Sequence, residues 1–104
     1  MDIPNTGGFF VVPEEIENAI LKHPAVAEVA VIGVPDEKWG NLVRAVVHLK
    51  PGMKASEEDI KEHCRRRVAR YQVPKSVAFA ASLPREVAHG KISRQEVFRM
   101  YGGS

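Results

Sequence analysis

Cysteine, aromatic residues and long apolar runs are all scarce in this chain. Its 104 residues include one cysteine, one tryptophan, two tyrosines and four phenylalanines. The single cysteine, Cys64, excludes an internal disulfide and fits a reducing compartment. No apolar stretch approaches the roughly 20 residues that span a bilayer, and the first residues lack the basic region and apolar run of a secretory signal. We therefore expect a cytoplasmic domain without a membrane span.

An excess of charge of one sign is also small. The formal net charge is +2, which is too little to indicate a nucleic-acid partner. Basic residues nevertheless gather in one region, with only Glu62 among them: Lys61, Arg65, Arg66, Arg67, Arg70 and Lys75. Two interpretations stay open, a solvated helix face or a site for a polyanionic small molecule, because guanidinium groups suit phosphate. The aromatic and glycine pattern of an RNA-binding module is missing.

Neither a metal site nor a nucleophilic triad is predicted. The four histidines are scattered, and Cys64 lacks the spaced partners that zinc requires. Because Cys64 keeps four-residue spacing with Ile60 and Val68, we expect a buried structural thiol rather than a nucleophile.

Hydrophobic periodicity and start and stop signals predict the secondary structure. A short apolar β segment follows Gly7 and Gly8, and a helix then begins at Pro13 and ends at Pro24. Runs rich in β-branched residues predict strands over 27–34, 42–49 and 76–81. Ser56 and Asp59 predict a capping box at the start of a second helix, and a final helix is predicted from Ser93 to near Gly102. The order β-α-β-β-α-β-α predicts an α+β domain, with a small mixed sheet of about three strands and helices packed on it.

Lys91 precedes the last helix directly. Ser93 and Glu96 predict a second capping box, and Ile92 with Val97 predicts a hydrophobic staple that fixes the entry of the chain into the helix. A long cationic side chain on such a base can bind an anion, which a helix start also favours. A solvated surface lysine satisfies the same pattern, so the residues alone leave both interpretations open.

The chain as a whole resembles the C-terminal domain of the adenylate-forming enzymes, which include acyl-CoA synthetases, peptide-synthetase adenylation domains and beetle luciferases. The resemblance rests on "GGFFVVPEEIENAILKHPAVAEVAVIGVPDEKWGNLVRAVVHLKPG", followed in order by "YQVPKSVAF", "LPR" and "GKISR". It implies a domain over residues 7–101, a remnant of the interdomain hinge segment over 1–6 and a flexible tail over 102–104. It also implies a large N-terminal domain as partner.

The resemblance implies a reaction in two steps. A carboxylic acid first reacts with ATP to give an acyl-adenylate and pyrophosphate, and coenzyme A then displaces AMP after the small domain has rotated. Lys91 matches the family's adenylation lysine, which reaches the carboxylate and the α-phosphate. Mg²⁺ is expected with ATP in the full enzyme and not in this domain.

The resemblance also implies a coenzyme A face. Gly7 and Gly8 match the glycines that line the pantetheine tunnel, and Phe10 lies near them. Trp39 resembles a tryptophan that contacts the coenzyme A nucleotide, although a partly buried turn anchor is an equal alternative. Tyr71 matches an aromatic that touches adenine, although its position also suits core packing. The expected phosphate contacts are Arg66, Arg67, Arg70 and Lys75.

Three departures from the family pattern bear on activity. The loop "EVAH" before Gly90 is one residue longer than usual, so the reach of Lys91 can differ. The hinge residue normally lies upstream of Gly7, near Met1, and the motifs for ATP and the carboxylate belong to the N-terminal domain. We therefore expect the isolated chain to be inactive.

Within the family, "GKISR" favours an acyl-CoA synthetase over a peptide-synthetase domain, which often carries Asp where Ser93 stands. The alternatives are part of such a peptide-synthetase domain or a free-standing binding or interaction module. The acyl substrate cannot be read from this chain, because its pocket belongs to the N-terminal domain.

Overall fold

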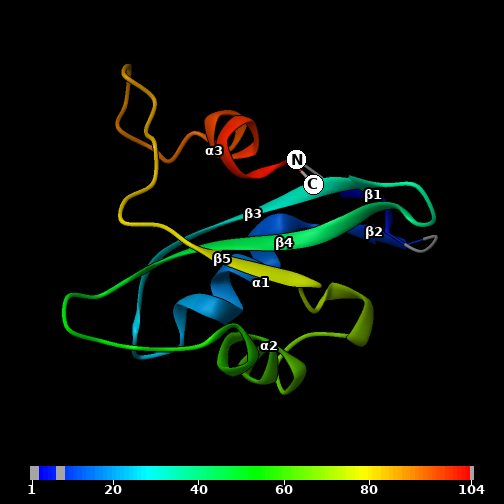
Figure 1. The fold of residues 1–104 in the computed structure, drawn as a ribbon, viewed down its shortest axis with the longest axis horizontal. Coiled ribbons are helices and arrows are strands. Elements are labelled where there is room, and N and C mark those ends of the chain that lie inside the picture. Colours follow the sequence, from blue (N-terminus) through cyan, green and yellow to red (C-terminus); the bar gives the residue numbers. More distant parts are fainter. Residues whose placement is uncertain (1–2, 7–8, 104) are drawn as a thin grey trace.

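A mixed sheet forms the middle layer of the domain, with helices on both of its faces (Figure 1). The computed structural model describes the backbone of residues 3–6 and 9–103 and the side chains of residues 11–103. The elements in chain order are β1 (Ile3–Thr6), β2 (Phe9–Val11), α1 (Pro13–Leu21), β3 (Val26–Asp36), β4 (Gly40–Leu49), α2 (Glu57–Arg65), the 3₁₀ helix η1 (Arg70–Gln72), β5 (Ser76–Phe79) and α3 (Arg94–Tyr101). The predicted α+β class is confirmed, and the order matches once the N-terminal β segment is counted as a pair of strands.

Strand β4 is the central strand of the sheet and pairs with β1, β3 and β5. It pairs antiparallel with β3 from Val26↔Leu49 to Asp36↔Gly40 and parallel with β5 from Arg44↔Ser76 to Val47↔Phe79. Strand β1 pairs with β4 at Thr6↔Gly40 and antiparallel with β2. The sheet order β2-β1-β4-β3 leaves β3 at an edge.

Alternating side chains of β3 and β4 supply two hydrophobic clusters, one on each face. Val29 and Val31 lie in the cluster that contains Ile16 of α1 and Ile60 of α2. The intervening residues of β3 lie in the second cluster, which contains Val97 of α3. Because both faces of the sheet are covered, β3 is apolar almost throughout rather than at every second residue.

Most of the predicted helix ends are confirmed. Pro13 is the first residue of α1, and Ser56 and Asp59 form the reciprocal capping box of α2. Gly102 is the C-cap of α3, where a Cβ would lie 2.4 Å from the Phe98 carbonyl oxygen. Helix α2, however, ends at Arg65, so Val68 packs on the core from the segment that follows rather than from the predicted third turn.

The second predicted capping box is only half formed. The Ser93 hydroxyl accepts the Glu96 N–H at 3.2 Å, as predicted. The Ser93 N–H, however, donates to the Pro84 carbonyl oxygen at 2.8 Å, and the Glu96 carboxylate binds Arg99 at 2.9 Å. Glu96 therefore does not close the box, because its backbone target is already bonded and an arginine lies one turn along the helix. The staple residues Ile92 and Val97 do lie in one cluster.

Candidate functional site

Lys91 lies at the base of a closed backbone hairpin. The Glu86 N–H donates to the Lys91 carbonyl oxygen at 2.7 Å, and the Gly90 N–H donates to the Glu86 carbonyl oxygen at 2.9 Å. Gly90 has φ of 68°, a left-handed conformation that glycine adopts without the steric penalty of a side chain. The "EVAH" loop thus closes on itself and leaves the Lys91 backbone opposite Glu86.

Two further contacts brace this hairpin. Arg85 pairs with Ile92 in an isolated antiparallel bridge, and its guanidinium donates to the Gly90 carbonyl oxygen at 3.0 Å. The same guanidinium forms an ion pair with Glu28 of β3. Among the residues whose side chains are described, none is recorded as a partner of the exposed Lys91 ammonium group. A fixed backbone therefore carries a cation that is available to a ligand.

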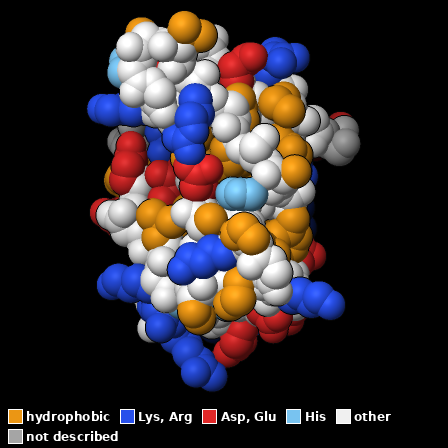
Figure 2. Space-filling model, turned by 90° about the vertical axis from the view of Figure 1, so that its left-hand side faces the viewer, with side chains coloured by type: hydrophobic (Ala, Val, Ile, Leu, Met, Phe, Trp, Pro, Cys, Tyr) orange, Lys and Arg blue, Asp and Glu red, His pale blue; other side chains and the backbone are white. Residues whose placement is uncertain are grey.

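The charge around the hairpin is mixed in sign. Arg85 is balanced by Glu28, and His89 lies 3.0 Å from Glu86. Figure 2 views this end of the molecule, and acidic and basic side chains interleave over its upper part. Lys91 thus lies among charges of both signs rather than on a broad basic surface.

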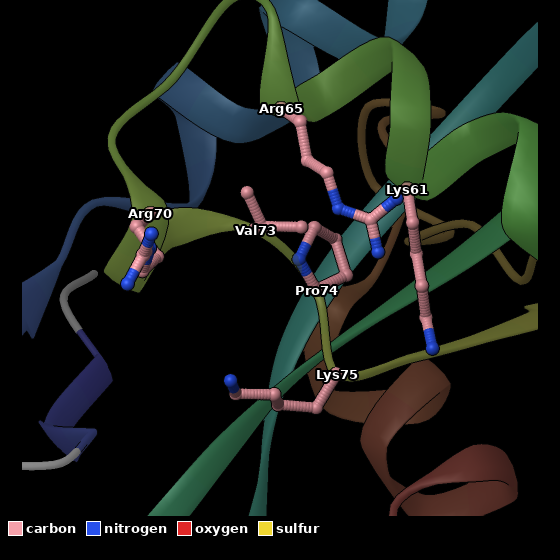
Figure 3. Close-up of a pocket in the computed structure, with 6 residues that line it drawn as sticks. All are labelled: Lys61, Arg65, Arg70, Val73, Pro74 and Lys75. Atoms are coloured by element: carbon pink, nitrogen blue, oxygen red, sulfur yellow. The ribbon is translucent and has the colours of Figure 1, made fainter.

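A basic pocket lies at the other end of the sheet from this hairpin. Four cationic side chains and two apolar residues line its volume of about 440 Å³: Lys61, Arg65, Arg70, Val73, Pro74 and Lys75 (Figure 3). They come from α2, from η1 and from the segment that leads into β5. In Figure 1 that end lies on the right, whereas the orange segment with the Lys91 hairpin extends on the left.

The segments around the basic pocket are held in place by backbone and amide contacts. Gln72 donates to Glu15 of α1 at 3.0 Å and accepts the Ala69 N–H at 3.0 Å, which anchors η1. The Lys75 N–H donates to the Val43 carbonyl oxygen of β4 at 2.8 Å. The backbone beneath Arg70 and Lys75 is therefore fixed, while both side chains can move.

Partners differ among the four cations of this pocket. Arg65 is paired with Glu58 at 2.7 Å and with Glu62 at 2.8 Å, and Lys61 lies 4.0 Å from Glu57. Within the described part of the chain, no side-chain partner is recorded for Arg70 or Lys75. Positive charge that is not neutralised internally attracts phosphate oxygens.

The four predicted phosphate contacts divide between two pockets. Arg70 and Lys75 line the basic pocket, whereas Arg66 and Arg67 line a separate pocket that also contains Asp59 and Glu62. Lys61 and Arg65 belong to the predicted basic run but were not among the predicted contacts. Their four-residue spacing, which places both on one helix face, is the sequence feature that could have predicted them as contacts.

Histidines line the second pocket as well. The ring centroids of His23 and His63 are 5.1 Å apart, in an edge-to-face arrangement, and His63 Nε2 lies 2.7 Å from the Ala19 carbonyl oxygen. Burial lowers the pKa of His63 below its ordinary value of 6.5. Among the described residues, no group of three or more His, Cys, Asp or Glu side chains is placed to hold a metal ion.

Only some of the predicted coenzyme A residues lie in the part of the chain that the structure describes. Gly7 and Gly8 lie outside the described residues, as does the side chain of Phe10 on β2. Trp39 lies in the β3–β4 turn, where Asp36 accepts its N–H at 2.8 Å, and 49% of it is exposed. Lys38 lies over its ring, 5.1 Å from the centroid. Tyr71 is part of η1 and is 38% exposed.

Cys64 is fully buried between α2 and the sheet. Burial raises the pKa of its thiol to about 11, so the reactive thiolate is scarce at neutral pH. The predicted structural thiol is thereby confirmed.

Within the part of the chain that the structure describes, no helix has the length and apolar character needed to cross a membrane.

Comparison with known proteins gives one consistent family. The chain is 44% identical over 103 residues to the long-chain-fatty-acid–CoA ligase FadD13 of Mycobacterium tuberculosis, covering 99% of the chain and 20% of that protein. It is 42% identical to the mitochondrial malonate–CoA ligase ACSF3 of Mus musculus, covering 95% of the chain and 17% of the ligase. The crystal structure of ATP-bound MatB from Rhodopseudomonas palustris superposes with a TM-score of 0.86 at 36% identity, over 92% of the chain and 19% of MatB.

The chain thus spans about a fifth of the length of the relatives that it matches. The family model of the AMP-binding enzyme C-terminal domain matches residues 15–91 and ends on the lysine at the base of the hairpin. This chain belongs to the AMP-binding enzyme C-terminal domain family.

Proposed function

We propose that this chain works as the C-terminal domain of an AMP-forming acyl-CoA synthetase. The overall reaction converts a carboxylic acid, ATP and coenzyme A into acyl-CoA, AMP and pyrophosphate. Both relatives named above are CoA ligases, which supports coenzyme A as the acceptor over a peptide synthetase. Because the chain spans a fifth of such ligases, the proposal includes a large N-terminal domain as partner and an inactive isolated chain.

Lys91 is proposed as the residue that supports adenylation. The observation that carries this assignment is the paired hairpin, which holds the Lys91 backbone opposite Glu86 while the ammonium group stays exposed. The acid carboxylate and the α-phosphate of ATP repel each other as they approach, and a positioned cation stabilises the charge that develops in the transition state. Mg²⁺ is proposed to accompany ATP in the N-terminal domain.

The opposite end of the domain is proposed to serve the thioester step. Coenzyme A carries several phosphates on its nucleotide, and the basic pocket offers two cations without recorded internal partners, Arg70 and Lys75. The exposed ring of Trp39 and Tyr71 are proposed to contact the nucleotide, and Gly7, Gly8 and Phe10 to line the pantetheine path. Arg66 and Arg67 remain proposed phosphate contacts, although their pocket also holds two carboxylates.

Two ends with different chemistry suit an enzyme in which the small domain rotates between half-reactions. The hairpin would face the N-terminal domain during adenylation, and the end with the basic pocket during thioester formation. Residues 1–6 are proposed to belong to the hinge segment, residues 7–101 to form the moving domain and residues 102–104 its tail. A cytoplasmic location is proposed because Cys64 is a free, buried thiol, which fits a reducing compartment.

The decisive experiment compares Lys91→Ala with the unchanged full-length ligase that contains this domain. Pyrophosphate release on adding acid and ATP reports adenylation, and thioester yield from supplied acyl-adenylate reports the second step. We expect adenylation to fall by about 10²–10³, as when one preorganised charge contact is removed, while thioester formation persists. Lys54→Ala is the matched control, because Lys54 is also an exposed loop lysine. If Lys91→Ala leaves adenylation unchanged, Lys91 is a surface charge and the assignment is wrong.

A further inference from the structure

Arg94, the first residue of α3, is held by a partly buried ion pair. Its Nη2 atom donates to both carboxylate oxygens of Glu17 at 2.8 Å, and its Nε atom donates to the Val31 carbonyl oxygen at 3.2 Å. The exposed fractions of the two side chains are 26% for Arg94 and 14% for Glu17. One planar guanidinium group thus bonds a side chain and a backbone group at the same time, which the single ammonium of a lysine cannot reproduce in the same geometry.

This pair covers the free edge of the sheet at Val31. Glu17 also accepts the Val31 N–H at 2.8 Å, so both backbone polar groups of Val31 on edge strand β3 are bonded by side chains. Glu17 comes from α1 on one face of the sheet, and Arg94 comes from α3 on the other. The pair therefore joins the two helical layers around the edge, and it fixes the start of α3 relative to both.

The start of α3 is continuous with the Lys91 hairpin. Next to Arg94, the Ser93 N–H donates to the Pro84 carbonyl oxygen, and the Glu86 N–H donates to Lys91 itself. At the other end of α3, Arg44 donates to the carbonyl oxygens of Tyr101 and Gly103. With the predicted capping box half open, the Arg94–Glu17 pair joins the Arg85–Glu28 ion pair and the packing of Ile92 and Val97 in tying the hairpin side of α3 to the rest of the domain.

We propose that Arg94 and Glu17 are positioning residues for adenylation: they hold the start of α3, and through it the backbone of Lys91, at the distance from the substrate that the reaction needs. This inference rests on the proposed role of Lys91. Arg94 itself need not touch substrate, because its three nitrogen atoms are directed at Glu17, Val31 and, at 3.8 Å, Glu14. A displacement on the order of 1 Å at a reacting group can cost about 10²-fold in rate.

The test is a double-mutant cycle in the full-length ligase. Arg94→Met removes the guanidinium but keeps a long apolar side chain, and it is made alone and together with Lys91→Ala. Arg99→Met is the matched control, because Arg99 is an arginine on the same helix whose pair with Glu96 is exposed. Adenylation and thioester formation are measured separately for each variant, with the melting temperature of every protein.

We expect Arg94→Met to lower kcat for adenylation by about 10–100-fold with little change in KM for ATP, because Lys91 acts in the transition state. In the Lys91→Ala background the same change should cause no further loss, because a positioning residue cannot act once the group it positions is gone. Amide exchange at Glu86 and Ser93 should also accelerate, which reports the hairpin without using activity.

Other outcomes overturn the inference in distinguishable ways. If Arg94→Met slows both half-reactions equally, or multiplies the loss caused by Lys91→Ala, the pair only stabilises the fold. If Lys91→Ala slows adenylation but Arg94→Met does not, the inference alone fails. If Lys91→Ala has no effect, the proposed role of Lys91 fails and the inference fails with it. Should Arg94→Met not fold, Arg94→Lys, which keeps the charge but loses the fork, is measured in the same cycle and decides by the same outcomes.

Discussion

At one end of the domain a single lysine is presented by a hairpin of paired backbone, whereas at the other end four basic side chains surround a pocket built from three segments. The first arrangement fixes one charge through backbone hydrogen bonds and the Arg94–Glu17 pair. The second gathers charge on long side chains, two of which have no recorded internal partner in the described chain. The difference fits the two proposed tasks, since a transition state demands one positioned contact whereas a flexible polyanion can be held by several mobile ones.

Among the tests of this difference between the two ends, we expect the largest effect from variants of the basic pocket. Replacing Arg70 and Lys75 with Glu should raise KM for coenzyme A by about 10–100-fold, because hydrogen bonds to charged groups contribute about 1.5–3 kcal/mol. Pyrophosphate release without coenzyme A should not change. The measurement is the dependence of thioester formation on coenzyme A concentration.

Arg66 and Arg67 supply the matched control for that test. They are arginines like Arg70, but they line the separate pocket that contains carboxylates. Changing both to Glu should raise KM for coenzyme A less than the Arg70 and Lys75 variant does. A larger rise for Arg66 and Arg67 would assign the nucleotide to the second pocket instead.

Alanine variants of two glycines with similar backbone conformations test the hairpin end. Gly90 has φ of 68° and Gly52 has φ of 75°, and a Cβ at either position would meet no atom within 4 Å. Ala should therefore cost a similar ~1–2 kcal/mol of stability at each, from the left-handed conformation alone. We expect only Gly90→Ala to slow adenylation, by several-fold, because Gly90 closes the turn before Lys91. Equal rates for the two variants would contradict a demand for a fixed hairpin.

The smallest expected effect is the dependence of stability on pH, which we attribute to His63, a residue of neither the hairpin nor the basic pocket. Burial holds the pKa of His63 below its ordinary value of 6.5, so the unfolded chain binds more protons than the folded chain below that pH. The stability that depends on a neutral His63 is fully present above pH 6.5. It is lost as the pH falls through the lowered pKa that His63 has in the folded chain. The free energy of unfolding of the 104-residue chain should therefore decrease between pH 7.5 and pH 5.5, which urea titration measures.

His63→Gln is the control for the pH effect, because glutamine does not titrate. Other groups that line the same pocket are His23, Asp59, Glu62, Arg66 and Arg67, and the pKa of Asp59 is lowered by its hydrogen bonds with Ser56. Asp59 loses its contribution only below its ordinary range, near pH 4. An unchanged slope between pH 7.5 and pH 5.5 in His63→Gln would show that another group causes the dependence.

Local signals predicted the elements well because their physical causes are local. Pro13, Ser56 and Ser93 mark helix starts through missing or unpaired backbone N–H groups, which depend on a few neighbouring residues. The half-open box at Ser93 shows the limit of such reasoning. The competing acceptor at Pro84 becomes visible only once the chain folds back into the hairpin.

Alternation along the sequence did not reveal the two faces of the sheet. Strand β3 is apolar at nearly every position, which fits a buried strand but does not say what covers each face. The structure assigns Val29 and Val31 to the α1 and α2 side and Ala30 and Ile32 to the α3 side. This three-layer arrangement is also what lets an arginine of α3 meet a glutamate of α1 around the edge.

The sequence by itself determined the α+β order, the helix starts, the buried thiol and, through the "GKISR" motif, the lysine on which the proposed function rests. These features follow from spacing along the chain, where hydrogen bonds and side-chain contacts join residues a few positions apart. The tertiary structure alone decided which cations share a pocket, and it alone paired Glu17 with Arg94 across 77 positions. Such contacts depend on how layers pack around the sheet, because residues distant in sequence become neighbours only after their hydrophobic faces are buried.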